Sequence, residues 1–289
     1  MPDKRTNPHK MGLLRKVALC LCMLVLSAGQ VSGYVLDGRH ILELMLDKMD
    51  LPGQMRVDQV LTVFDERFET GQLEIAETAW YKIPENFRTE IQTKNLNRIY
   101  LASGDETLTV LDGKIVSQDS NPIYHYKDLF CFRNRQSLAD HLAYLGMNVS
   151  KSSYGRWEGT VAYVIGAQYP DESKPQLWVE KSSFLPIRWI FQVDHPSVGQ
   201  DRVEFRYKDW QQTEGAWYPG LIEIIQGKGL SRRIDLQDIE INPPFTDVLF
   251  NIDHLRGLYS ETGLETEPSE SENDIDQQIK EFRDIFESE

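Results

Sequence analysis

Residues 72–111 read QLEIAETAWYKIPENFRTEIQTKNLNRIYLASGDETLTVL, and this stretch decides the fold. Four runs in it are rich in β-branched and aromatic residues: 72–83, 87–93, 98–103 and 107–111. Only short turn segments such as Pro84-Glu85-Asn86 separate them. Connections this short join strands of opposite direction, because parallel neighbours need a long crossover. The stretch therefore predicts consecutive antiparallel hairpins.

The same pattern continues on both sides of this stretch. A strand is expected over 57–64, Asp112-Gly113 predicts a further hairpin, and strand-like runs return between 154 and 239. In all, roughly eleven strands are expected, with helices at 37–49 and 136–145 and without alternating βαβ units. This order is typical of an antiparallel meander, and hence of a sandwich, a barrel or an open barrel.

Several strands carry apolar side chains on both faces. In PIRWIFQV, residues 186–193, Trp189 and Phe191 share one face, whereas Ile190 stands on the other. A sheet of this kind must bury both faces or leave one for a ligand. The two expected helices can cover part of a concave face, but they do not fill a large barrel.

The first 33 residues are expected to be a secretory signal peptide. Five basic residues precede the apolar run VALCLCMLVL at 17–26, and small residues follow it up to Gly33. The run is shorter than the about 20 apolar residues of a membrane-spanning helix. Cleavage after Ala28 or Gly29 and an uncleaved signal anchor are the alternatives. Cleavage after Gly33 leaves only Cys131, so the exported domain must fold without an internal disulfide.

The chain is strongly acidic, with a formal net charge of −14. Removing the five basic residues and one acid of residues 1–33 lowers the charge to −18, which disfavours nucleic acid and anionic membrane surfaces as partners. Acids concentrate in a tail, 259–289, whose first part is expected to be a polar linker. Beyond it, an apolar stripe predicts a short amphipathic helix that docks on a partner or on its own domain, with a solvated tail as the alternative. The stripe consists of Ile275, Ile279, Phe282 and Phe286.

The sequence contains no recognisable catalytic or metal-binding motif. Its six histidines stand outside the close spacings of metal sites, and it has no nucleophile elbow, P-loop or dinucleotide-binding fingerprint. Cys131, between two phenylalanines, is expected to be a buried small hydrophobe. We therefore expect no enzyme activity, no cofactor and no metal ion; an enzyme with a dispersed site is the alternative.

Large aromatic side chains are spread over most of the expected strands. Core packing is the simpler interpretation of each one alone. Together they supply more apolar surface than two short helices can cover. A pocket for an acyl chain needs such a lining, with many apolar contacts and few fixed polar groups.

Three stretches resemble the periplasmic lipoprotein-carrier superfamily, which comprises LolA, LolB and relatives such as sigma-factor regulators of the RseB type. AWYKIPENFR at 79–88 is similar to the strand, proline and aromatic corner of the family. VLDGKIVSQDSNP at 110–122 and QLWVEKSSFLPIRW at 176–189 are similar to two of its hairpins. The resemblance implies an open (half) antiparallel β-barrel with helices as a lid on the concave face. It implies that this face holds lipid acyl chains, without enzyme activity or a cofactor.

The sequence departs from the family pattern in two places. Ile83 stands before the corner proline, where the carrier proper has an arginine that controls lid opening. Ile115 to Gln118 stand where the family has an aromatic step. These departures concern the hand-off of lipoproteins, and they leave the lipid-binding scaffold in place.

The resemblance and the strand alternation predict a lipid-binding domain over 34–258, between the signal peptide (1–33) and the acidic tail (259–289). The expected cavity residues are Trp80, Ile83, Phe87, Tyr100, Trp178, Trp189, Phe191, Phe205 and Trp217, with Met45 and Met49 as lid contacts. Alternation alone does not say which face is concave, because a one-residue error exchanges the faces.

The predicted function is that of a periplasmic carrier or chaperone. It would bind lipid or lipoprotein acyl chains in a hydrophobic cavity, deliver them towards the outer membrane, and have an envelope membrane protein as a partner. The alternative is a periplasmic regulatory or scaffold protein of the same fold that senses a lipid or protein ligand.

Overall fold

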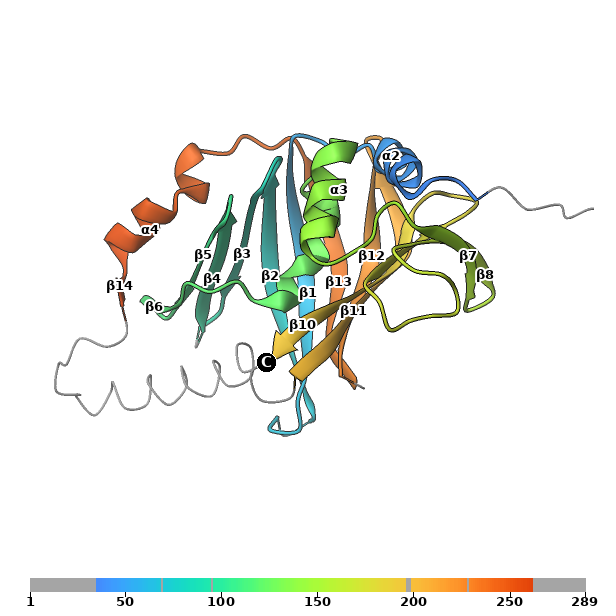
Figure 1. Ribbon diagram of the computed structural model, residues 1–289. Helices are drawn as coiled ribbons and strands as arrows, with labels where there is room; N and C mark the ends of the chain where they lie inside the picture. Colours follow the sequence, from blue (N-terminus) through green and yellow to red (C-terminus); the bar gives the residue numbers. More distant parts are fainter. Residues whose placement is uncertain (1–34, 69, 95, 196–198, 228, 262–289) are drawn as a thin grey trace, which may run out of the picture. The chain divides into compact units, whose positions relative to one another are not determined.

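The computed structural model describes residues 35–261, apart from 69, 95, 196–198 and 228 (Figure 1). The expected signal peptide and residues 262–289 of the acidic tail lie outside this part. The strands are β1 Gln54–Phe64, β2 Gln72–Lys82, β3 Asn86–Gln92, β4 Asn97–Ser103, β5 Glu106–Leu111, β6 Lys114–Ser117, β7 Ser152–Trp157, β8 Thr160–Ile165, β9 Gln176–Glu180, β10 Pro186–His195, β11 Gly199–Thr213, β12 Ala216–Gln226, β13 Gly229–Ile241 and β14 Ser260–Glu261. The helices are α2 Gly38–Met49, η1 Pro122–Phe130, α3 Arg135–Tyr144, η2 Asp247–Phe250 and α4 Ile252–Leu258.

All these strands belong to one sheet, in the order β14-β6-β5-β4-β3-β2-β1-β13-β12-β11-β10-β9-β8-β7. The chain forms two meanders, which join where β1 pairs with β13. Strands β1 to β13 are antiparallel to their neighbours, and only the two-residue β14 is parallel to β6. In the described chain, β7 and β14 stand at opposite ends of this order, so the sheet is open. The expected open antiparallel barrel is confirmed, with thirteen antiparallel strands instead of roughly eleven.

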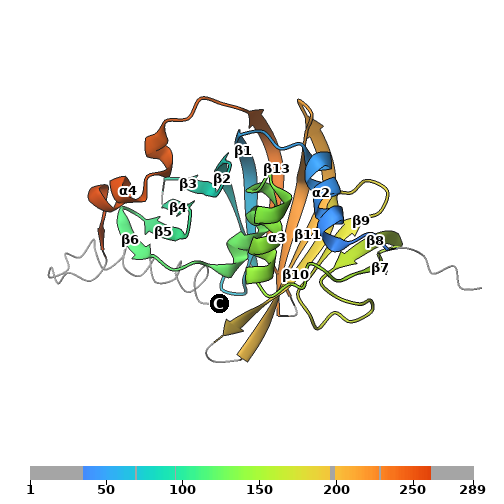
Figure 2. The same ribbon diagram turned by 45° about the horizontal axis from the view of Figure 1, so that its top comes forward.

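The two expected helices are present. Asp37 caps α2, its carboxylate accepting from the backbone N–H of Arg39 at 3.0 Å, and the apolar stripe of α2 is buried. Asn134 caps α3 in the same way. The two helices pack together and lie over one face of the sheet (Figure 2). Within the described residues, no helix is both long and apolar enough to cross a bilayer.

A third covering segment, the 3₁₀-helix η1, was not expected from the sequence. It begins at Asn121, whose side chain accepts from the N–H of Ile123, and Pro122 follows at its first position. Its aromatic side chains point at the sheet, where the ring of Phe130 lies 4.9 Å from that of Tyr218. We call the face beneath α2, η1 and α3 the covered face.

The other face of the sheet, the opposite face, has its own cover at one end. Side chains of η2 and α4 form a buried cluster with strands β4 to β6; its members are Ile99, Leu101, Leu108, Val110, Ile115, Phe250, Ile252 and Leu255. Tyr259, the first residue of the expected tail, packs against this cluster, and Ser260–Glu261 form β14. Both faces are therefore buried here, which explains why these strands lack a clean polar–apolar alternation.

At strands β10 and β11, the opposite face carries a network of ion pairs. Arg188 and Glu204 are both about 5% exposed, and two hydrogen bonds of 2.8 and 2.9 Å join them. Burial by itself raises the pKa of Glu204, but hydrogen bonds from Arg188 and Arg206 outweigh it and lower the pKa to about 2. Charged side chains of this kind satisfy one another instead of facing a ligand.

Candidate functional site

Aromatic side chains from both meanders meet on the covered face. Each of them is at most 2% exposed: Tyr81, Phe87, Tyr100, Trp189, Phe191, Phe205, Tyr207 and Tyr218. The η1 segment adds Tyr124, Tyr126 and Phe130 from above. Tyr126 is placed between the two meanders, with its ring 6.1 Å from Phe87 and 6.5 Å from Phe205. The covered face is thus a continuous aromatic surface with η1 laid upon it.

The structure brings together only part of the residues expected to line the cavity. Phe87, Tyr100, Trp189, Phe191 and Phe205 lie on the covered face, and Met45 and Met49 of α2 are fully buried. Whether these residues contact a ligand stays a prediction.

Trp80 and Trp178 lie instead on the opposite face. Trp80 packs against the cluster under α4, and Trp178 packs with Ala162, Val164 and Ala167. Successive side chains of a strand point to opposite faces of the sheet, so Trp80 lies on the opposite face because its neighbour Tyr81 lies on the covered face.

The remaining two expected residues lie at the ends of interior strands, Ile83 directly after β2 and Trp217 at the start of β12. Ile83 is half-buried at a corner, where its backbone N–H donates to the carbonyl of Gly53 at 2.9 Å. Trp217 is half-buried beneath the ammonium group of Lys48, 4.4 Å from the ring centre. It is Tyr218, one residue later, that contacts Phe130 of η1.

Three tyrosines of the covered face were missed in the sequence, although signals for two of them exist. Tyr81 stands opposite Phe87 in the β2–β3 hairpin, and the turn fixes that register. Tyr207 stands two residues after Phe205 on one strand and so shares its face. Tyr218 adjoins Trp217, which alternation alone places on the other face of the strand.

The cavity found between η1 and strands β1, β2, β12 and β13 is small, with a volume of about 10 Å³. The rings of Tyr124, Tyr126 and Phe130 fill what would otherwise be a trough. A chain-like ligand could reach the part of the aromatic surface that lies beneath these rings only by displacing η1.

Polar contacts help to hold η1 in place. The hydroxyl of Tyr207 donates to the carbonyl of Tyr126 at 3.0 Å, and the buried Arg98 donates to the hydroxyl of Tyr124. Arg98 also lies 3.9 Å from the carboxylate of Glu77, which is buried below η1. Burial raises the pKa of Glu77, although the charge of Arg98 opposes this.

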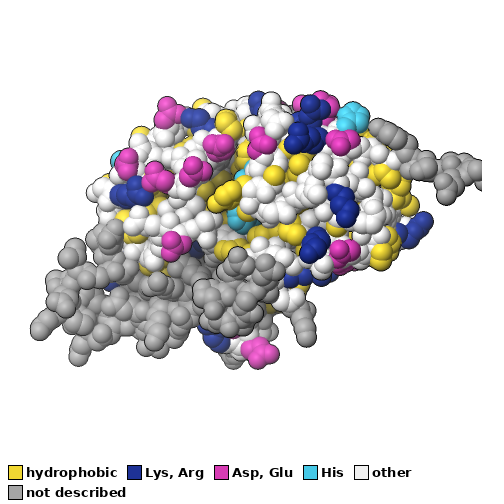
Figure 3. Space-filling model, in the orientation of Figure 1, with side chains coloured by type: hydrophobic (Ala, Val, Ile, Leu, Met, Phe, Trp, Pro, Cys, Tyr) yellow, Lys and Arg dark blue, Asp and Glu magenta, His cyan; other side chains and the backbone are white. Residues whose placement is uncertain are grey.

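Beside η1 the surface opens into a cavity of about 670 Å³. It lies between η1, α3 and the turn that joins β4 to β5. The rings of Tyr100 and Tyr124 form part of its wall, so the cavity reaches the edge of the aromatic surface. Figure 3 shows histidine side chains in a hollow of this face, with hydrophobic and acidic side chains around it.

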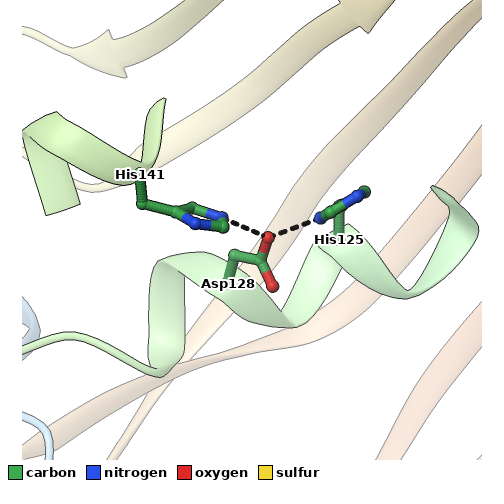
Figure 4. Close-up of side chains that lie close together, drawn as sticks. All are labelled: His125, Asp128 and His141. Carbon is green, nitrogen blue, oxygen red and sulfur yellow. Dashed lines mark hydrogen bonds and ion pairs between the residues drawn. The ribbon is translucent and has the colours of Figure 1, made fainter. Parts of the chain in front are cut away.

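Two histidines and an aspartate meet in the wall of this cavity (Figure 4). Oδ2 of Asp128 accepts from Nδ1 of His125 and from Nε2 of His141, both at 2.6 Å, and Oδ1 accepts from Nζ of Lys127 at 2.6 Å. Burial alone raises the pKa of Asp128, but the charges of Lys127 and His125 outweigh it and hold the pKa well below its usual value. Asp128 is therefore a buried carboxylate that ties η1 to α3.

The sequence predicted no metal site, because no histidines stand in a familiar close spacing. The structure corrects the premise of that expectation, since it gathers two histidines and a carboxylate from two elements. His125 and Asp128 are three residues apart in η1, and this His-x-x-Asp spacing was a usable signal. His141 could not be added to it without the fold. Cys131 nearby is buried, and burial raises the pKa of its thiol to about 12, so it stays protonated.

Comparison with solved structures identifies the fold. A LolA superfamily protein from Nitrosomonas europaea superimposes with a TM-score of 0.52 at 15% identity, over 76% of this chain and 100% of that one. This chain has the LolA-type fold. A DUF1329 family protein from Desulfovibrio piger has a TM-score of 0.50 at 12% identity, over 76% of this chain and 98% of that one. A domain named for outer membrane lipoprotein sorting, from Vibrio parahaemolyticus, has a TM-score of 0.50 at 11% identity, over 75% of this chain and 97% of that one.

No protein-family model and no curated protein sequence matches this chain. At identities this low, the three structures establish a LolA-type fold and nothing about the ligand. A functional conclusion must therefore rest on the covered face itself.

Proposed function

We propose that this protein is a non-enzymatic carrier that binds the acyl chain of a lipid or lipoprotein against the covered face. The observation that supports the proposal is the aromatic surface beneath η1. Its aromatic side chains come from both meanders, and the segment that lies directly on them is a 3₁₀-helix, a type of helix that is less stable than an α-helix. The named role of one structural neighbour in lipoprotein sorting agrees with this.

Magnitudes indicate that exchange of η1 for an acyl chain is feasible. Each buried methylene group contributes about 0.8 kcal/mol, so a chain of about sixteen carbons gains on the order of 10 kcal/mol. Lifting η1 exposes five buried apolar side chains, and each loses about 1.5 to 3 kcal/mol. They are Ile123, Tyr124, Tyr126, Leu129 and Phe130. The loss of about 8 to 15 kcal/mol is comparable to the gain. A carrier needs such a balance, because it must release its ligand as well as bind it.

The place of action that we propose is the periplasm. Export would use residues 1–33, which lie outside the described chain. The ligand would be handed towards the outer membrane, with an envelope membrane protein as the donor or acceptor. The LolA-type fold and the sequence pattern of residues 1–33 support this proposal.

A photoactivatable fatty acid tests the proposal directly. The purified protein is incubated with the probe and irradiated, and the labelled peptides are mapped by mass spectrometry. We expect labels on η1 and on the covered-face residues of β10 to β12, and an excess of unlabelled fatty acid should suppress them. Absence of saturable labelling would refute the proposal, as would labels confined to the opposite face around Phe250.

A further inference from the structure

Three potential metal ligands converge where η1 meets α3 (Figure 4). The ligand atoms of His125, Asp128 and His141 lie within 4.8 Å of one another, and each histidine nitrogen lies 2.6 Å from the same carboxylate oxygen. Zinc bonds of 2.0 to 2.2 Å place tetrahedral ligand atoms about 3.3 Å apart. Each nitrogen–oxygen separation would have to widen by about 0.7 Å, and the two nitrogens, which are at most 4.8 Å apart, would have to lie about 3.3 Å apart; side-chain rotation can supply both changes. We propose that these three residues bind a divalent transition-metal ion such as Zn²⁺.

Both imidazole rings are already oriented for this role. Their nitrogens face one oxygen. When each neutral ring carries its proton on the other nitrogen, Nε2 of His125 and Nδ1 of His141, two lone pairs are directed at this region. Aromatic neighbours fix the rings: Phe191 lies 5.2 Å from His125, and Phe132 lies 5.0 Å from His141. Little side-chain freedom is therefore lost when a metal ion binds.

The charge around the site favours a cation. The cavity wall holds the carboxylates of Glu85, Asp105, Asp128 and Asp140 but only one ammonium group, that of Lys127. Lys127 opposes the ion, and the three further carboxylates offset it. Because its Nζ bonds to Oδ1 of Asp128, Oδ2 remains directed at the two histidines.

The donor set selects the class of ion. Two imidazoles and one carboxylate suit zinc and its neighbours in the first transition series, whereas calcium and magnesium prefer oxygen ligands alone. All three residues border the cavity of about 670 Å³. The fourth coordination position would therefore be open to water or to an oxygen atom of a bound ligand.

One consequence rests on the function proposed above. His125 and Asp128 belong to η1, whereas His141 belongs to α3, so the ion would join two segments that close the covered face. A ligand that binds only the closed form stabilises that form. Bound metal should therefore slow acyl uptake, but metal binding itself does not depend on the acyl proposal.

The test uses the full-length chain without a polyhistidine tag, freed of metal with a chelator. Zn²⁺ is titrated in competition with a chromophoric chelator. We expect one equivalent to be bound, with the affinity reduced at least about tenfold in His141→Ala and in the His125→Ala/His141→Ala double variant. The matched control is His40→Ala in α2, because His40 also faces a carboxylate three residues away, Glu43, at 3.1 Å. This control should bind as the wild type does.

The double variant serves as the internal reference. Zn²⁺ held by Cys20, Cys22 or Cys131 would persist in it, so only the difference from the wild type counts. Equal Zn²⁺ binding in the wild type and the double variant would overturn the proposal. His141→Cys covers the case in which the alanine variants fail to fold. With Co²⁺ it should show a thiolate-to-cobalt absorption band stronger than any that the cysteines of the wild type produce, and the absence of this excess would also refute the site. A fatty-acid probe taken up at one rate with and without Zn²⁺ would refute only the link to closure.

Discussion

Phe130→Ala tests whether η1 is the element that a ligand displaces. The ring of Phe130 is fully buried and contacts four others: Tyr81 at 6.4 Å, Tyr207 at 5.8 Å, Trp210 at 6.3 Å and Tyr218 at 4.9 Å. Its removal should lower the free energy of unfolding by about 3 to 5 kcal/mol. In a form with η1 lifted, these contacts are already lost. The substitution therefore favours the lifted form over the closed form by about 3 kcal/mol.

Acyl affinity should then rise while stability falls. If the ligand binds only the lifted form, a shift of about 3 kcal/mol raises the apparent affinity by about a hundredfold, up to the point where the lifted form predominates. The matched control is Phe250→Ala. Phe250 is 5% exposed but lies in the cluster under α4, so the loss of stability should be similar and the acyl affinity unchanged.

Two measurements decide the matter. Urea unfolding followed by tryptophan fluorescence gives the stability of each variant, and titration with a fluorescent fatty acid gives its affinity. If both variants bind the fatty acid as the wild type does, or if Phe130→Ala binds more weakly, then η1 does not control access and our reasoning is wrong.

Three further predictions concern the stability of the fold. Because the pKa of Glu204 is lowered from its ordinary value of 4.5 to about 2, the ionised side chain stabilises the protein fully at pH values above 4.5, and about 2 to 3 kcal/mol of the free energy of unfolding should be lost as the pH falls from 4.5 to about 2. In urea unfolding between these pH values, Glu204→Gln should flatten the dependence of stability on pH, and an unchanged slope would count against this reasoning. Gly155→Ala should lower stability by about 1 to 3 kcal/mol, because the new methyl group would meet the ring of Trp178 at 2.6 Å; a neutral outcome by calorimetry would show that the ring yields. Gly257→Ala in α4 meets nothing within 4 Å and should raise the melting temperature slightly, since alanine favours a helix by up to about 1 kcal/mol; a decrease would contradict the placement of α4.

The packed covered face bears on how the proposed carrier would work. The described chain is closed, with η1 in the place that an acyl chain would take and with a cavity of about 10 Å³ beneath it. Binding would then be an exchange between a segment of the protein and the ligand. The ties at Tyr126, Tyr124 and Asp128 become the points at which release can be controlled.

Local signals in the sequence determined most of the elements. The Asp112-Gly113 turn and the Pro84-Glu85-Asn86 corner set hairpins, and Asp37 with the apolar stripe after it set α2, because turns and caps act over a few residues. The start of η1 carries such a signal as well, in Asn121 followed by Pro122. The segment was missed because a 3₁₀-helix does not show the 3.6-residue period by which helices are recognised.

Only the tertiary structure decided which face of each strand became the covered face. A strand shows the same alternation from either side, so Tyr81 and Trp80 are equivalent until η1 is seen to lie over one of them. The pairing of β1 with β13 joins segments more than a hundred residues apart, and no local pattern in either segment predicts it. For the same reason the sequence alone contains His125, Asp128 and His141 as three separate polar residues. Their convergence depends on the packing of α3 beside η1, and that packing is set by the sheet beneath them.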